Sequence, residues 1–299
     1  MTTPPVCSYE GSDYQTSFWE KGGRAYEDAC EASALKRLLP PQGEHLLELG
    51  AGAGRNTPRY HGYKLITLLD YSRTQLEHAR QKLGDSPRYR YIAADIYHLP
   101  FVPGVFDGAT MIRTLHHMAD APLALAQVER ALQPGAAFIL EYANKRNIKS
   151  ILRYLLRKQT WSPFTREPVE YIPLNFDFHP AAIRKWLGDL GFSIIRTLTV
   201  SHFRMGLLKR LFPVHFLAWL DSLAALTGNW WQLSPSVFLL THSKLDGTSA
   251  PEGAFFACPA CGTPLEDTPP LLHCSRCQHA YPVTGGIYDF RLDPPAGVN

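Results

Sequence analysis

The segment ELGAGAG, residues 48–54, constrains the fold of this chain more than any other part of its sequence. A short apolar run at residues 45–49 leads into its three alternating glycines. Because glycine adopts positive φ angles at little cost, the chain can turn sharply here and its backbone can approach a ligand closely. We expect a helix to begin directly after the turn, with its free N–H groups facing whatever binds.

Short apolar runs alternate with helical patterns on both sides of this turn. The strand candidates are residues 45–49, 65–70, 89–95, 106–114, 136–142, 193–200 and 237–242, and the helix candidates are residues 29–39, 74–83, 122–132 and 180–190. This alternation predicts an α/β fold, with a Rossmann-like, doubly wound and mainly parallel sheet covered by helices on both faces. Helical insertions interrupt the sheet at about residues 144–179 and 201–236, and residues 10–40 are expected to form a helical cover.

The bulk composition is that of an ordinary globular protein. The 299 residues are 45% hydrophobic and 19% charged, and the net charge of +3 neither requires nor excludes a nucleic-acid partner. We expect no secretory signal and no transmembrane segment, because Lys209, Arg210 and Asp221 interrupt the longest apolar stretch. The cytoplasm is the expected location.

Three carboxylates narrow the choice of ligand, since a glycine-rich turn alone also suits a nicotinamide cofactor, a nucleotide or no ligand. Glu48 precedes the glycines, where it would repel a pyrophosphate but attract the ammonium group of S-adenosylmethionine. Asp70 ends the next strand and can accept from both ribose hydroxyls, a feature that dehydrogenases share. Asp95 ends the third strand, where it can accept a hydrogen bond from the adenine amino group.

The motifs ELGAGAGRN, LLDYS, AADIYHLPF, FDGATMIRTLHHM and VERALQPGAAFILEY, in this order, resemble those of class I S-adenosylmethionine-dependent methyltransferases. They are most similar to the group that contains quinone-biosynthesis and wobble-uridine tRNA methyltransferases. The resemblance implies a cofactor site in which Glu48, Gly50, Gly52 and Gly54 surround the methionine part, Asp70 binds the ribose, Tyr71, Asp95 and Ile96 lie at the adenine, and Arg113 meets the cofactor from the fourth strand.

His116 and His117 follow the fourth strand and are candidates for a general base, since histidine titrates near neutrality. The alternative is that this pair only packs against the loop. Methyl transfer is an in-line displacement on a strong electrophile, so positioning supplies much of the rate and no diagnostic catalytic residue is expected.

Four of the six cysteines form two CxxC pairs near the end of the chain. Cys258, Cys261, Cys274 and Cys277 have the spacing of a tetrahedral Cys₄ site, which predicts one structural zinc rather than disulfides. Residues 254–293 contain too little apolar material for a core of their own, so metal binding should be coupled to their folding. We expect Cys274→Ser to lower stability while leaving cofactor affinity nearly unchanged.

The segment also resembles the small zinc-ribbon activator subunit of tRNA, rRNA and release-factor methyltransferases. The resemblance implies a ribbon that docks on its own methyltransferase domain, residues 1–244, through a polar linker at residues 245–253. The matching features are the four cysteines, the Tyr281-Pro282-Val283 step and Gly286-Ile287.

The two insertions are where substrate choice is expected to reside. Lys149, Arg153 and Arg157 would form one basic stripe on a helix. The stripe would face RNA, a phosphorylated metabolite or a lipid head group, or only solvent. The aromatic second insertion would line a pocket for an apolar substrate, contact a membrane surface, form core or cover the ribbon.

These patterns predict an enzyme that methylates a small molecule, with a quinone- or polyketide-like acceptor as one candidate. The alternatives are an RNA methyltransferase with a fused zinc-ribbon activator, and a non-catalytic scaffold with a degenerate cofactor site. The absence of an extended basic surface in the sequence favours the small molecule.

Overall fold

The structure is a computed structural model that describes residues 4–12, 19 and 21–292. Its centre is a sheet of seven strands in the order β3-β2-β1-β4-β5-β9-β8, extended at the β3 edge by three more. The seven are β1 (Gly43–Leu49), β2 (Tyr63–Asp70), β3 (Tyr89–Ala93), β4 (Phe106–Met111), β5 (Leu132–Ala143), β8 (Ser193–Val200) and β9 (Ser236–His242). Only β9 runs antiparallel to its neighbours within these seven, so the predicted mainly parallel sheet is confirmed.

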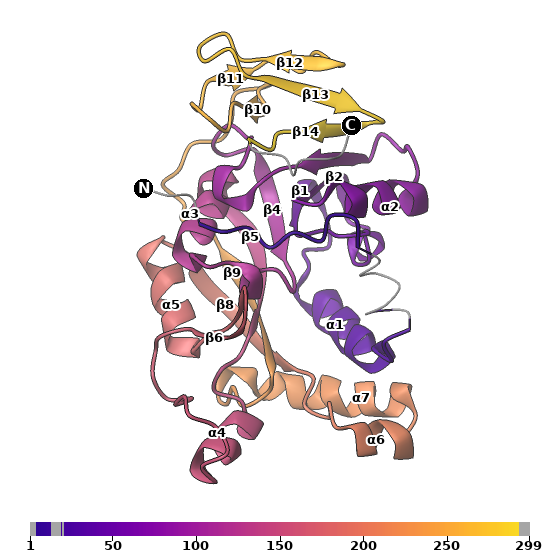
Figure 1. Ribbon diagram of the computed structural model, residues 1–299, viewed down its shortest axis with the longest axis vertical. Coiled ribbons are helices and arrows are strands. Elements are labelled where there is room, and N and C mark those ends of the chain that lie inside the picture. Colours follow the sequence, from indigo (N-terminus) through magenta and orange to yellow (C-terminus); the bar gives the residue numbers. More distant parts are fainter. Residues whose placement is uncertain (1–3, 13–18, 20, 293–299) are drawn as a thin grey trace.

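Helices cover both faces of the sheet, as the alternating pattern predicts (Figure 1). On one face, α3 (Ala121–Ala131) and α5 (Pro180–Asp189) bury residues such as Leu125 and Ile183. On the other face, α1 (Ala25–Leu38), α2 (Arg73–Leu83) and α7 (Val214–Ala224) bury Leu35, Leu76 and Leu217. The result is a three-layer domain with one apolar cluster on each side of the sheet.

The expectation of a helix directly after the glycine turn is wrong. The chain makes only one 3₁₀ turn there, η2 (Thr57–Arg59), before β2 begins at Tyr63. The crossover is too short for a helix of ordinary length, and Pro58 within the turn cannot donate an interior helical hydrogen bond. Helix α1 packs against η2 instead and covers this part of the sheet.

The N-terminal cover is only partly helical. Residues 4–12 form an irregular strap without helix or strand, and the first helix, α1, begins at Ala25. Residues 13–18 and 20 of the expected cover lie outside the described residues.

The C-terminal residues form five short strands. They are β10 (Phe256–Ala257), β11 (Pro264–Leu265), β12 (Leu271–His273), β13 (Ala280–Thr284) and β14 (Ile287–Asp289). Strand β14 pairs in parallel with the edge strand β3, with Ile287 beside Tyr91, so the large sheet continues into this unit. The guanidinium carbon of Arg90 on β3 lies 4.3 Å from the centre of the Phe255 ring. The linker that precedes the C-terminal unit also contacts the large domain, since Ala250 N–H donates to the Gly104 carbonyl over 2.9 Å.

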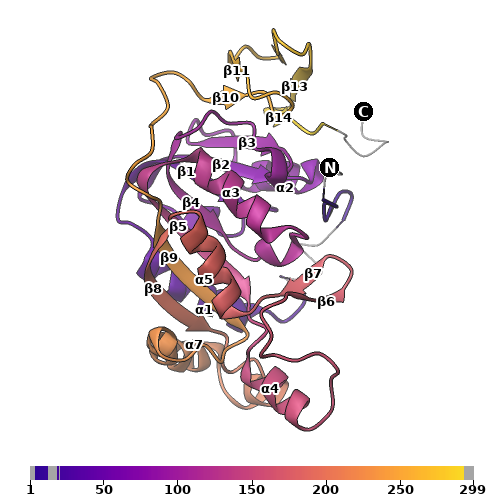
Figure 2. The same ribbon diagram turned by 90° about the vertical axis from the view of Figure 1, so that its left-hand side faces the viewer.

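The helices of both insertions lie at the end of the molecule opposite to the C-terminal unit, while the hairpin of the first insertion lies nearer the middle (Figures 1 and 2). The first insertion holds α4 (Ile148–Leu155) and a hairpin of β6 (Val169–Ile172) and β7 (Asn175–Asp177), which the helical pattern did not predict. The second holds α6 (Gly206–Leu211), α7 and η5 (Ala225–Asn229), and its distance from the C-terminal unit excludes the alternative that it covers a ribbon. In the part of the chain described, no helix is long and apolar enough to cross a membrane.

The basic stripe on the first insertion needs a correction. Helix α4 ends at Leu155, and Arg157 lies beyond it with a φ angle of 54°, so only Lys149 and Arg153 share the helix. The leucines of its apolar side are exposed instead of packed over the site.

Candidate cofactor and metal sites

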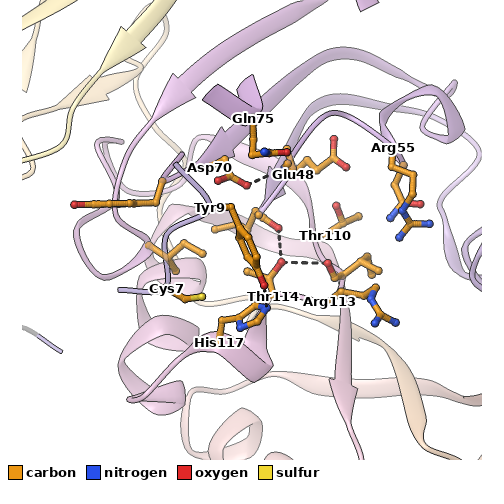
Figure 3. A pocket seen from close by; sticks show the side chains of 18 of the residues that line it. Cys7, Tyr9, Glu48, Arg55, Asp70, Gln75, Thr110, Arg113, Thr114 and His117 are labelled. Atoms are coloured by element: carbon orange, nitrogen blue, oxygen red, sulfur yellow. Dashed lines mark hydrogen bonds between the residues drawn. The ribbon is translucent and has the colours of Figure 1, made fainter. Parts of the chain in front are cut away.

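A pocket lies at the carboxyl ends of the central parallel strands, where an open α/β sheet binds ligands (Figure 3). The space between its lining residues is about 990 Å³, part of which is open solvent, so the pocket is not closed. Its walls include the predicted residues Glu48, Gly50, Gly52, Asp70, Tyr71, Asp95, Ile96, Arg113 and His117. The fold thus brings together residues that are spread over 70 positions of the sequence.

The glycine turn is built for close approach of its backbone. Gly50 has a φ angle of +67°, and a Cβ atom there would lie 2.1 Å from the Thr114 hydroxyl oxygen. Gly52, with φ of +52°, lines the pocket and donates its N–H to the Asp70 carboxylate over 2.8 Å. Gly54 is not among the described lining residues. It faces α2, where a Cβ atom would lie 2.8 Å from Leu83, so its place in the cofactor site stays a prediction.

Glu48 is buried beside the turn and accepts a hydrogen bond of 2.6 Å from the Thr57 hydroxyl. Burial raises the pKa of its carboxyl to about 7, against the opposing effect of hydrogen bonds from Thr57 and Tyr60. A cation that enters the pocket would stabilise the ionised form of the Glu48 carboxyl, which burial disfavours. The group therefore suits an ammonium ligand.

Asp70 is held by the backbone on both carboxylate oxygens. One accepts from Gly52 N–H over 2.8 Å, and the other from Ser72 N–H over 2.9 Å. Burial raises the pKa of this carboxyl. Because a carboxylate offers about four acceptor positions, two remain for hydroxyl groups such as those of a ribose.

Asp95 begins the short 3₁₀ turn η3 (Ile96–His98) at the other side of the pocket. Its oxygens accept from Tyr97 N–H over 2.9 Å and interact with His98 Nδ1 at 3.1 Å. Ile96 and Tyr71 contribute apolar surface to the same pocket. A flat ring such as adenine fits between such apolar side chains, with a carboxylate at its edge.

Gln75, in the pocket wall, has a buried polar atom with no hydrogen-bond partner among the described residues. The side-chain oxygen of Gln75 is buried and accepts no hydrogen bond, while its amide nitrogen donates to the Ser12 carbonyl over 2.9 Å. A buried acceptor without a donor is costly, so the position fits a ligand that donates. Together with the acids and the glycine turn, Gln75 supports the fit of S-adenosylmethionine, which carries hydroxyl, amino and ammonium donors.

Arg113 has the positive φ angle of 56°, which is rare for a residue with a side chain. Its N–H donates to the Glu141 carboxylate over 2.9 Å, and its guanidinium donates to Glu31 over 3.1 Å. These two buried acids were not predicted from the sequence. They hold the loop after β4 in its unusual conformation at the pocket wall.

His117 lines the pocket, whereas His116 is not among the described residues that do. The Nδ1 atom of His117 lies 3.0 Å from the Leu174 carbonyl, so Nδ1 carries the proton and Nε2 is an acceptor. The Tyr9 hydroxyl lies 3.1 Å from Nε2. Burial lowers the pKa of His117, so the ring is neutral at pH 7, and its unprotonated Nε2, which faces the Tyr9 hydroxyl, can take a proton.

The strap of residues 4–12 closes one side of the pocket, and Val6, Cys7 and Tyr9 line it. The strap is anchored by Glu10, whose carboxylate accepts the N–H groups of Arg73 and Thr74 over 3.0 Å each. No pattern in the sequence indicates this role, because the contact joins residues more than 60 positions apart.

The four CxxC cysteines lie together in the C-terminal unit, with all their sulfur atoms within 4.8 Å of one another. The two knuckles are built alike. Gly262 N–H donates to the Cys258 carbonyl over 2.7 Å, and Gln278 N–H donates to the Cys274 carbonyl over 3.0 Å. Four sulfurs around one ion at the usual zinc–sulfur length of about 2.3 Å would be about 3.8 Å apart. The cluster therefore fits a single tetrahedral metal ion.

Comparison with known proteins identifies the kind of domain that holds this pocket. Residues 47–140 match the family described as "Methyltransferase domain". The O-methyltransferase cnsE of Penicillium expansum is 38% identical over 109 residues, which are 35% of this chain and 40% of the relative. The demethylmenaquinone methyltransferase of Chlamydia trachomatis is 35% identical over 130 residues, 42% of this chain and 55% of the relative. The chain thus spans about half or less of the length of these curated relatives.

Solved structures share the fold at low sequence identity. A chain from the complex of a Haloferax volcanii methyltransferase with the Trm112 methyltransferase activator superposes with a TM-score of 0.55 at 15% identity, covering 77% of this chain and 96% of that one. An S-adenosylmethionine-dependent methyltransferase from Listeria monocytogenes gives 0.54 at 16% identity, covering 73% and 99%. The family match over residues 47–140 and the named relatives show a methyltransferase domain in this chain, and the solved structures show that it shares their fold.

Proposed function

We propose that this protein transfers a methyl group from S-adenosylmethionine to a small apolar acceptor of the quinone or polyketide type. The observation that carries the proposal is the strap beside the cofactor residues, because Val6, Cys7 and Tyr9 line the same pocket and would cover a small acceptor bound there. The names of the relatives support it, since they include O-methyltransferases and a demethylmenaquinone methyltransferase.

The residues of the pocket divide into two groups. Glu48, Asp70 and Asp95 would hold the ammonium, ribose and adenine parts of S-adenosylmethionine, whose sulfonium supplies the electrophilic methyl group. Ile112 and Met118 lie beside His117 and offer apolar surface to the acceptor. His117 Nε2 would take the proton from an acceptor hydroxyl, either directly or through the Tyr9 hydroxyl.

We also propose that the four cysteines bind a structural zinc ion. Four thiolates would close its coordination shell and leave no position for water or substrate, so the metal would have no catalytic part. Its role would be to fold the C-terminal unit, which then adds strand β14 to the edge of the methyltransferase sheet.

RNA methylation is the second candidate. It is favoured by exposed cations on the first insertion, such as Lys149, Arg153 and Arg157. The strap disfavours it, because Val6, Cys7 and Tyr9 line one side of the pocket that a base of RNA would have to enter.

The first experiment measures cofactor binding by isothermal titration with S-adenosylmethionine. Asp70→Ala should weaken binding by about 1–3 kcal/mol, the scale for stranding polar partners. Asp189→Ala is the matched control, since Asp189 is exposed and pairs with Lys185 on the surface. Intact protein that binds no S-adenosylmethionine would contradict the enzyme and favour a scaffold.

The second experiment follows radiolabelled methyl groups into two fractions, total RNA and metabolites extracted with organic solvent. We expect label in the organic fraction. Label that appears only in RNA would contradict the proposed acceptor and favour the second candidate.

A further inference from the structure

Both insertions expose apolar side chains at one end of the molecule. We call this surface the basic apolar face and define it as α4 with residues 156–158, α6, the exposed side of α7 and residues 225–231. In both views, α4 and α7 lie at the end opposite to the C-terminal unit (Figures 1 and 2). They follow the carboxyl ends of β5 and β8, which is the sheet edge that carries the pocket.

Helix α4 turns its apolar side toward solvent. Leu152 is 52% exposed and Leu155 is 65% exposed. Among the described residues of this helix, only Ser150 is buried. An amphipathic helix normally packs its apolar stripe against a core, so the stripe of α4 is free for a partner outside the chain.

Helices α6 and α7 continue the apolar surface. Leu211 is 64% exposed, and the rings of Phe212 and Phe216 lie 5.6 Å apart in a row that continues to Trp219. The opposite side of α7 is anchored, because Leu217 is buried against the domain. Helix α7 is therefore packed on the domain through one side and exposes apolar side chains on the other.

The two insertions are joined at their bases. Ile148 N–H donates to the Leu233 carbonyl over 2.9 Å, and the Asn144 side chain donates to the Gln232 carbonyl over 2.8 Å. Trp230 and Trp231 directly precede this junction and are largely exposed. Hydrogen bonds thus hold α4 and the tryptophans in one surface.

Exposed cations lie on the first insertion and on α6, beside these apolar side chains. Residues 144–166 contain seven lysines or arginines and no acid, and all of the seven except the buried Lys145 are exposed. Lys149, Arg153 and Arg210 are exposed, and none of them forms an ion pair with another described residue. A second copy of the chain would bring like charges together, and RNA offers no apolar partner for leucines.

We propose that the basic apolar face binds the surface of a phospholipid membrane that contains anionic lipids. Amphipathic helices with leucine and tryptophan on one side and cations beside them insert their apolar side at the boundary of headgroups and acyl chains. The cations then meet the negative surface potential of the membrane. The inference does not depend on the methyl acceptor, although an apolar acceptor dissolved in the bilayer would be close to the pocket.

Vesicle flotation with the full chain tests this proposal. Vesicles of phosphatidylcholine alone are compared with vesicles containing phosphatidylglycerol, each at low and high salt. We expect binding to the anionic vesicles that salt weakens, because salt screens surface charge. Leu155→Glu combined with Leu211→Glu should weaken binding roughly tenfold or more. Lys149→Glu combined with Arg153→Glu should weaken it by about fivefold per residue or more.

Matched control variants distinguish a loss of binding through the basic apolar face from a general effect of adding glutamate to the surface. Leu245→Glu changes a leucine that is 83% exposed and far from the face, and Lys82→Glu changes an exposed lysine on α2. Both should leave vesicle binding unchanged, and all variants should keep their affinity for S-adenosylmethionine. That affinity and methyl transfer to a water-soluble acceptor test the proposed function separately.

Three results would overturn the proposal. The first is a wild-type protein that floats with neither type of vesicle. The second is equal loss of binding in the face variants and in the controls. The third is a protein that is dimeric by analytical ultracentrifugation, becomes monomeric with Leu155→Glu and binds no vesicle, since a second copy would then cover the face.

Discussion

The guanidinium of Arg291, in the C-terminal unit, lies 3.0 Å from the carboxylate of Glu10, in the N-terminal strap. Arg291 is almost fully buried and also pairs with Asp289. Its guanidinium carbon lies 5.8 Å from the centre of the Tyr71 ring, which lines the cofactor pocket. The cysteine-bearing unit and the strap are therefore connected at the wall of the cofactor site.

Arg291→Gln should weaken binding of S-adenosylmethionine, because Glu10 loses a charged partner and the strap is held less firmly. We expect a loss of stability of about 1–3 kcal/mol, the range for hydrogen bonds to charged groups. Titration calorimetry and thermal unfolding measure the two effects. Arg276→Gln, which changes an exposed arginine of the same unit, serves as the control. If both variants bind the cofactor like the wild type, the strap does not depend on this ion pair.

Removal of the metal should also weaken the binding of S-adenosylmethionine. The sequence alone predicts that Cys274→Ser lowers stability and spares cofactor affinity. With β14 paired to β3 and Arg291 bound to Glu10, we expect the affinity to fall together with stability. The measurements are metal analysis, thermal unfolding with and without chelator, and titration with S-adenosylmethionine. A metal-free protein with an unchanged cooperative melt would contradict the zinc site.

Glu48 should make cofactor binding depend on pH. Its pKa of about 7 in the ligand-free protein means that the carboxyl is largely protonated at pH 6 and ionised at pH 8. Because the ionised form attracts an ammonium group, affinity should rise with pH through about 7. Each pH unit below that value should cost up to about tenfold. Glu48→Gln should bind more weakly and with little dependence on pH over this range.

The same carboxyl should affect stability with the opposite sign. Its pKa lies above the ordinary value of 4.5, so the folded protein keeps a proton that the unfolded chain releases. The free energy of unfolding should therefore fall as pH rises between about 4.5 and 7. Without ligand, Glu48→Gln should melt at a higher temperature than the wild type at pH 8. A lower melting temperature would show that hydrogen bonds to the carboxylate outweigh its burial.

His117→Gln should lower kcat by about 10²–10⁴-fold, the range for a general base, with little change in cofactor affinity. Since burial lowers the pKa of His117, its contribution to the rate should be constant above pH 7 and fall only in acid. His116→Gln is the matched control, because His116 is absent from the described pocket wall. Equal effects of the two substitutions would indicate that the pair only packs against the loop.

The sequence by itself determined the seven strands of the large sheet, and it named most of the predicted residues that the fold brings together in the pocket. Local patterns carry this information: a period of two or 3.6 residues selects the element, and strand ends bring Asp70 and Asp95 to one edge. The CxxC spacing likewise requires no knowledge of the rest of the chain.

Only the tertiary structure decided which surfaces meet. The ion pair of Glu10 with Arg291, the pairing of β14 with β3 and the acids behind Arg113 join residues far apart in the sequence, and no local pattern encodes such partners. The leucines of α4 have the same amphipathic pattern whether the helix is buried or exposed. Their exposure depends on the remaining chain, because other helices cover the two faces of the sheet and α4 packs on neither.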